Sequence, residues 1–125
     1  MCSALVHAAS LRDLKMRELL KDVSKLERDV KHNGSLSFKT PTEIKPCCML
    51  SALECYHSQL SLLDDQDNVS WRRVNRSMGS PLIREKLRGS QEACGSSLQC
   101  QECHSYPNAT SQVFMRSLVD LLQMV

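Results

Sequence analysis

Four cysteines are spaced so that two disulfide bridges could join distant parts of the chain. Cys48 and Cys55 are seven residues apart in a segment with helical periodicity. At a rise of about 1.5 Å per residue they would lie on one helix face, about 10 Å apart. Cys100 and Cys103 form a Cys-x-x-Cys motif in a loop, where nearly extended chain also spans about 10 Å. The bridges would be Cys48–Cys100 with Cys55–Cys103, or the crossed arrangement, and spacing does not choose between them.

The remaining cysteines and a neighbouring histidine leave alternatives open. Cys47 and Cys94 could form a third bridge or remain thiols. Cys47, Cys48 and the segment Cys100–His104 could bind zinc, but two of these ligands are adjacent and the usual second half of a zinc motif is missing. A redox Cys-x-x-Cys would open a helix in a βαβ setting, which the sequence lacks. We therefore expect disulfide bridges, no metal and no cofactor.

No catalytic motif is present in the sequence. The four histidines are scattered, and there is no Gly-x-Ser-x-Gly, glycine-rich phosphate loop or His-Glu-x-x-His. A net charge of +2 is too small to favour general nucleic-acid binding. No apolar run reaches the length of about 18 residues that spans a bilayer. We predict a protein that is not an enzyme, binds no nucleic acid and does not insert into membranes.

The cysteine content indicates an oxidising compartment. Seven cysteines in 125 residues are typical of small domains stabilised by disulfides made in the secretory pathway. Four Asn-x-Ser/Thr sequons favour the same location and predict N-glycosylation at Asn33, Asn68, Asn75 and Asn108. Residues 1–9 lack a charged n-region and are too short for a whole signal peptide, so we interpret them as the remnant of one or as a disordered leader. The prediction is a secreted, extracellular protein.

The elements that must position these residues are four helices. With only 4% aromatic residues the core must come from aliphatic side chains, which suits helix packing. Helical spacing of apolar residues predicts helices at 11–32, 47–63, 69–78 and 110–125 in one domain at 10–125. Residues 79–107 are predicted to be a long connection with one helical turn around 82–87. Long connections are what an up-up-down-down bundle requires, so the fold class is all-α, a disulfide-stapled four-helix bundle.

A run of basic residues follows the predicted third helix and overlaps it. In a nearly neutral chain such a run is either a solvated face or a surface that steers an acidic protein partner or a sulfated glycan, and we favour steering. Its members are Arg72, Arg73, Arg76, Arg84, Lys86 and Arg88.

Several motifs resemble the interleukin-2/interleukin-15/interleukin-21 family of short-chain four-helix cytokines, and the interleukin-21 branch in particular. They are Met16–Val23, the Cys48-x6-Cys55 pair, the segment Cys100–Tyr106 and the ending Phe114–Met124. The resemblance covers about 11–125 and implies parallel pairing of the bridges, Cys48–Cys100 and Cys55–Cys103. The chain departs from the interleukin-21 pattern at four positions, Asp13, Cys47, Asn75 and Cys94.

The same resemblance implies a function. Such a cytokine would bridge a private receptor chain, similar to the interleukin-21 receptor, and the common γ chain, and so trigger Janus kinase/STAT signalling in lymphocytes. The residues implied for the common γ chain are Gln123, Leu14 and Asp120. Those implied for the private chain are Lys15, Arg17, Arg72, Arg73 and Arg76. The alternatives are an interleukin-15- or interleukin-2-like cytokine that uses the β/γ receptor pair, or a small cysteine-based zinc or redox module; in the cytokine case the ligand is expected to be a monomer.

Overall fold

The computed structural model describes residues 3–30, 36–63, 67–92 and 100–125, and this part of the chain is mostly helical. Its α-helices are α1 (Ser3–Asp29), α2 (Met49–Leu60), α3 (Val69–Met78), α4 (Pro81–Glu92) and α5 (Ser111–Gln123). Short 3-10 turns lie at Pro46–Cys48, Ser61–Leu63 and Cys103–Ser105. The strands β1 (Phe38–Lys39) and β2 (Asn108–Ala109) pair antiparallel, Phe38 opposite Ala109. The all-α prediction is confirmed.

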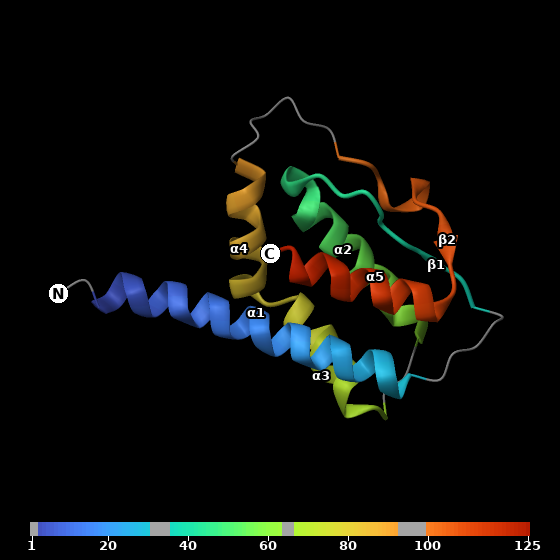
Figure 1. Cartoon of the computed structure of the whole chain (residues 1–125), viewed down its shortest axis with the longest axis horizontal. Helices are drawn as coiled ribbons and strands as arrows, with labels where there is room; N and C mark the ends of the chain where they lie inside the picture. Colours follow the sequence, from blue (N-terminus) through green and yellow to red (C-terminus); the bar gives the residue numbers. More distant parts are fainter. Residues whose placement is uncertain (1–2, 31–35, 64–66, 93–99) are drawn as a thin grey trace.

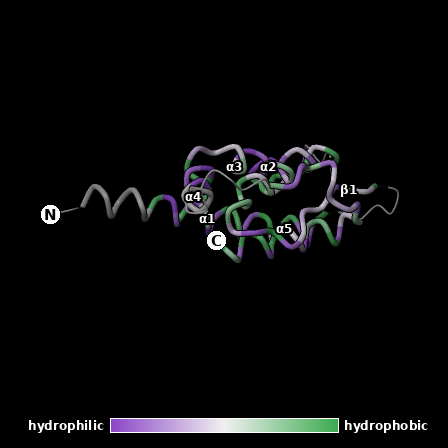
Figure 2. Tube along the Cα trace, turned by 90° about the horizontal axis from the view of Figure 1, so that it is seen from above, coloured by the Kyte–Doolittle hydropathy of each residue, from purple (hydrophilic) through white to green (hydrophobic). Residues whose placement is uncertain are grey.

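The chain directions are those of an up-up-down-down bundle. In Figure 1, α1 and α2 run from left to right, whereas α3 and α5 run back from right to left. Figure 2 shows α2 and α3 on one side of the molecule and α5 on the other. Helix α1 packs against both α3 and α5, so each of these helices has α1 as a neighbour.

The helices differ from their predicted bounds at several ends. Helix α1 begins at Ser3 rather than near residue 11, since residues 3–10 contain no glycine or proline to stop it. The segment predicted as one helix at 47–63 is α2 with a 3-10 turn at each end. The predicted end of the first helix, at residue 32, lies outside the described residues.

Helix α4 is the main departure from the prediction. Residues 81–92 form a helix of 12 residues, where a single turn at 82–87 within a long connection was expected. Pro81 occupies a position that tolerates proline, and Ile83 and Leu87, one turn apart, are both buried. Arg84 pairs with Glu54 of α2 at 3.0 Å. Helix α4 therefore closes one end of the bundle across α1 and α2 (Figure 1).

The centre of the core is a cluster of three aromatic rings. Phe114 of α5 stacks on Phe38 of β1, with ring centroids 4.8 Å apart, and lies 5.2 Å from the ring of Tyr56 on α2. The Tyr56 hydroxyl donates a hydrogen bond to the carbonyl oxygen of Pro41 at 2.8 Å, so its polar end is satisfied where it is buried. These contacts join α2, α5 and the connection between α1 and α2.

Two disulfides attach the segment before α5 to α2. Cys48 is bonded to Cys100 and Cys55 to Cys103, with Cα–Cα distances of 5.5 Å and 5.2 Å. Of the two arrangements that spacing allowed, this is the parallel one. Cys47 is disulfide-bonded as well, and Cys94 lies outside the described residues.

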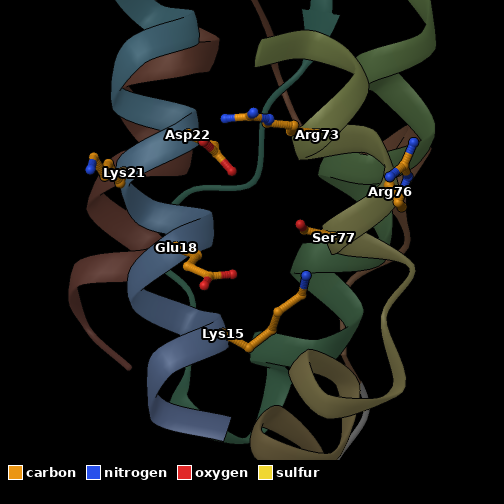
Figure 3. Close-up of a pocket in the computed structure, with 7 residues that line it drawn as sticks. All are labelled: Lys15, Glu18, Lys21, Asp22, Arg73, Arg76 and Ser77. Atoms are coloured by element: carbon orange, nitrogen blue, oxygen red, sulfur yellow. The ribbon is translucent and has the colours of Figure 1, made fainter. Parts of the chain in front are cut away.

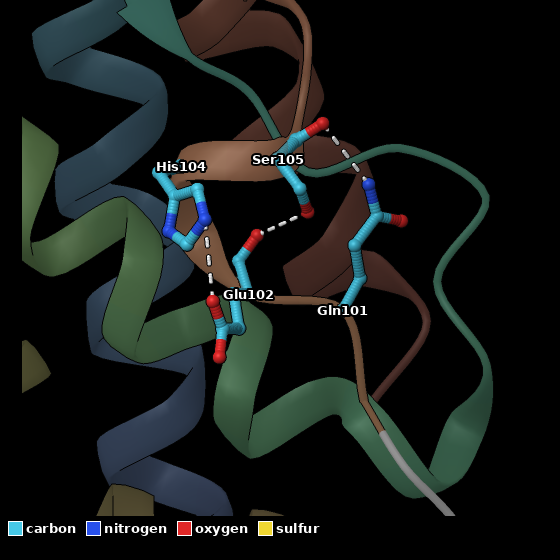
Figure 4. Close-up of polar contacts among 4 residues, drawn as sticks. All are labelled: Gln101, Glu102, His104 and Ser105. Atoms are coloured by element: carbon cyan, nitrogen blue, oxygen red, sulfur yellow. Dashed lines mark hydrogen bonds and ion pairs between the residues drawn. The ribbon is translucent and has the colours of Figure 1, made fainter.

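The same two disulfides exclude the zinc and redox alternatives. Both need Cys100 and Cys103 as thiols, but Cys100 is bonded to Cys48 in the 3-10 turn before α2 and Cys103 to Cys55 of α2. His104 Nε2 lies 3.2 Å from Glu102 Oε2, and both side chains are exposed (Figure 4). The loop is held by its own hydrogen bonds, Gln101 Nε2 to the Ser105 carbonyl at 3.2 Å and Ser105 Oγ to the Glu102 carbonyl at 2.6 Å. The Cys-x-x-Cys-His motif is thus a structural anchor.

Candidate functional site

Two grooves open along α1, one on each side. The first, called here the α1–α3 groove, has a volume of about 420 Å³. The second, the α1–α5 groove, has a volume of about 320 Å³ and also touches α4. Neighbouring residues of α1 contribute to different grooves because positions two apart on a helix point in nearly opposite directions.

The α1–α3 groove is lined by charged side chains from both helices. Lys15, Glu18 and Asp22 follow one another at intervals of three and four, so they share one face of α1. In Figure 3, Lys15 extends toward α3 near Ser77, and Arg73 extends from α3 toward Asp22. The complete lining is Lys15, Glu18, Lys21, Asp22, Arg73, Arg76 and Ser77.

Packing of α3 is what turns its arginines toward solvent. Trp71, Val74 and Met78 are buried against the bundle, and Trp71 Nε1 donates to the carbonyl oxygen of Leu60 at 3.1 Å. The helix begins at Asn68, whose side chain accepts a hydrogen bond from the Trp71 amide. With this face fixed, Arg72, Arg73 and Arg76 are all exposed.

The α1–α5 groove combines apolar side chains with a few polar groups. Its lining is Asp13, Met16, Arg17, Leu20, Lys86, Leu122, Gln123 and Val125. Lys86 Nζ lies 2.5 Å from Asp13 Oδ1. This hydrogen bond and the charge of Lys86, with a smaller contribution from Arg17, hold the pKa of the Asp13 carboxyl below its ordinary value. The end of α5 presents Gln123 to this groove because Leu121 and Leu122 are buried beside it.

The structure brings together only part of each predicted receptor set. Lys15, Arg73 and Arg76 line the α1–α3 groove together, and Arg72 is exposed on α3 outside that lining. Arg17, predicted with Lys15, lines the α1–α5 groove instead.

The residues predicted with Gln123 are also separated. Leu14 is 48% exposed on α1 but does not line the α1–α5 groove. Asp120 lines a third groove of about 330 Å³, between α5 and the segment Pro41–Ile44. Its carboxylate accepts a hydrogen bond from Arg116 at 3.1 Å.

Comparison with known families decides the class of protein. The family model described as Interleukin 15 matches residues 2–125, nearly the whole chain. The chain belongs to the interleukin 15 family. No individual curated protein matches this cytokine closely enough to be named as its relative.

The family gives the general class of function. Cytokines of the interleukin-2/interleukin-15 type are secreted signalling ligands that bind cell-surface cytokine receptors, and the family is not one of enzymes. Within the described residues no group of three or more His, Cys, Asp or Glu side chains could hold a metal ion. Among the helices that the structure describes, none is long and apolar enough to cross a membrane.

Sequence reasoning did not identify several of the residues that line the two grooves. Glu18 and Asp22 could have been found from Lys15, because positions three and seven residues on share its helix face. Lys86 was predicted only as a member of the basic run. Its place in the α1–α5 groove had no sequence signal, since it reaches that groove only because α4 forms and crosses α1.

The sequons lie in different surroundings. Asn68 caps α3, and Asn75 Oδ1 lies 3.2 Å from His57 Nε2. Asn108 is exposed in β2, and Asn33 lies outside the described residues. N-glycosylation at these four positions stays a prediction.

Proposed function

We propose that this cytokine holds two receptor chains together on the cell surface, one in each groove along α1. The α1–α3 groove binds a private chain similar to the interleukin-21 receptor, and the α1–α5 groove binds the common γ chain. The Janus kinases on the two intracellular tails then meet and start STAT signalling in lymphocytes. The cytokine acts as a monomer, because one copy offers both surfaces.

The observation that carries this proposal is the position of α1 between two open grooves. A single rigid helix with a receptor surface on each side fixes the angle between the two bound chains. The disulfides support the same role, since they attach the segment before α5 to the start and middle of α2 and so restrict the position of α5 relative to α2.

The charges favour the private chain as the first partner. The half-buried Lys15 and the exposed Arg73 and Arg76 give the α1–α3 groove cations, which would speed encounter with an acidic receptor surface. Glu18 and Asp22 alternate with these cations and would select for matching charges on the partner. The α1–α5 groove has a larger apolar share, as the centre of a protein interface commonly does.

A second candidate is favoured by the family match itself. The matching model is that of interleukin 15, so the private chain could instead be the β chain of the β/γ receptor pair. Binding to a panel of purified receptor ectodomains, with the interleukin-21 receptor and the β chain side by side, separates the two candidates. The partner that binds in the α1–α3 groove should lose affinity for Arg76→Glu.

The test of the two-surface arrangement uses the last turn of α5. Gln123→Lys places a charge where an amide lines the α1–α5 groove, and we expect at least a roughly 100-fold loss of common γ chain binding and of STAT phosphorylation. Affinity for the private chain should stay unchanged.

Gln112→Lys is the matched control, because Gln112 is an exposed glutamine of the same helix that lines none of the three grooves. It should signal like the unmodified cytokine. Unchanged signalling by Gln123→Lys would rule out the assignment of the second surface.

A further inference from the structure

Arg17 belongs to a different surface from Lys15, although the two are close in sequence. Lys15 lines the α1–α3 groove, and Arg17 lines the α1–α5 groove together with Gln123. A separation of two residues rotates a side chain by about 200° around a helix, so one partner cannot easily reach both.

The side chains that line the α1–α5 groove include more cations than carboxylates. The groove holds one carboxylate, Asp13, and two cations, Lys86 and Arg17. The Asp13 carboxylate already forms an ion pair with Lys86, with 2.5 Å between Oδ1 and Nζ. Among the residues that the structure describes, Arg17 has no ion pair of its own, and its side chain is exposed. Arg17 is therefore the cation of this groove that is available to a partner.

The surroundings of Arg17 suit a carboxylate on the partner. The guanidinium group can bind a carboxylate through two parallel hydrogen bonds, and the Gln123 amide in the same groove can donate another. Val125, 38% exposed, and the buried Met16 and Leu122 supply apolar surface around this polar centre. A partner that fits thus presents an acidic side chain within an apolar patch.

We propose that Arg17 binds the second receptor chain, not the private chain, by pairing with a carboxylate on that chain that also contacts Gln123. This inference rests on the proposed function, in which the α1–α5 groove binds the second chain. Arg17 then contacts the same receptor chain as Gln123, and that chain presents a carboxylate to both residues.

The experiment compares three charge reversals in the full-length cytokine. Arg17→Glu, Lys15→Glu and Arg88→Glu change the net charge equally, and Arg88 is exposed on α4 without lining any of the three grooves. Private-chain affinity is measured on the immobilised ectodomain by surface plasmon resonance. Common γ chain affinity is then measured on the preformed cytokine–private chain complex, at low and at high salt.

Arg17→Glu should weaken common γ chain binding about tenfold or more, with less than a twofold change at the private chain. The loss should shrink as salt rises, because salt screens exposed charges. Lys15→Glu should show the opposite pattern, and Arg88→Glu should change neither affinity. Arg17→Gln, which removes the charge without reversing it, should give a smaller loss in the same direction and serves if Arg17→Glu does not fold.

Loss of private-chain affinity in Arg17→Glu, or no change at either chain, would overturn the inference. Failure of the unmodified cytokine to bind either chain would instead refute the proposed function, so the two failures can be told apart.

Discussion

Removal of the Cys55–Cys103 bridge tests how the disulfides stabilise this bundle. The change is Cys55→Ala with Cys103→Ala, which leaves the Cys48–Cys100 bridge intact. In the chain-entropy account, a bridge stabilises by limiting the unfolded chain, and the gain depends on the number of residues in the loop that it closes. The relevant loop is the shortest covalent path between the two cysteines.

The second bridge shortens that path. Cys55 and Cys103 are 48 residues apart along the chain, which alone would correspond to about 4 kcal/mol. With Cys48–Cys100 in place, the path runs back along α2, across that bridge and forward to Cys103, a loop of about ten residues. The expected loss of unfolding free energy is then about 3 kcal/mol, or about 12 °C in Tm for a domain of this size.

The assay is urea unfolding followed by far-ultraviolet circular dichroism, without reductant. Val113→Ala is a suitable control, because Val113 is exposed on α5 and its loss should cost under about 0.5 kcal/mol. Since neither cysteine lines the α1–α3 or the α1–α5 groove, the variant should keep the proposed binding to the private chain at temperatures where it is folded. A loss below about 1 kcal/mol would refute the idea that this bridge limits the unfolded chain.

Two further predictions concern the aromatic cluster. Phe114→Ala should lower the unfolding free energy by about 3 to 5 kcal/mol in urea titrations, because it empties a fully buried site between Phe38 and Tyr56, and a loss under 1 kcal/mol would contradict the packing described here. Tyr56→Phe should cost about 1 to 2 kcal/mol at neutral pH, because it leaves the Pro41 carbonyl without its hydrogen bond. Burial raises the pKa of Tyr56 in the folded protein, so above about pH 10 the unfolded chain loses its proton first and stability should fall as pH rises. Tyr56→Phe should make that fall less steep, and an equally steep fall in both proteins would argue against it.

Local periodicity was enough to predict most of the bundle. Residues such as Leu19, Leu26, Val74 and Leu118 recur at helical intervals and are all buried. Long connections favoured the up-up-down-down order because parallel neighbours can be joined only by a chain that runs the length of the bundle. Both signals are properties of the sequence itself, and no distant contact is needed to read them.

Periodicity did not predict the full length of helix α4. A glycine and a serine interrupt its period, and its stability comes from contacts with distant elements, chiefly the burial of Ile83 and Leu87 in the core. Because the full length of α4 was not predicted, the sequence did not show that Lys86 would contact Asp13, 73 residues away. Contacts of that kind depend on the angles at which helices cross, and the periodicity of a single helix does not determine those angles.

The sequence by itself determined the helical class, the core faces and the cysteines able to bridge α2 to the last connection, because each depends on spacing along a few turns of chain. Only the tertiary structure decided which cysteine bonds to which and how the charged residues of α1 divide between two grooves. Lys15 and Arg17 are neighbours in sequence, but they acquire different surroundings once α3 packs on one side of α1 and α5 on the other. A receptor surface is made by several elements at once, and their relative positions follow from packing of the whole bundle.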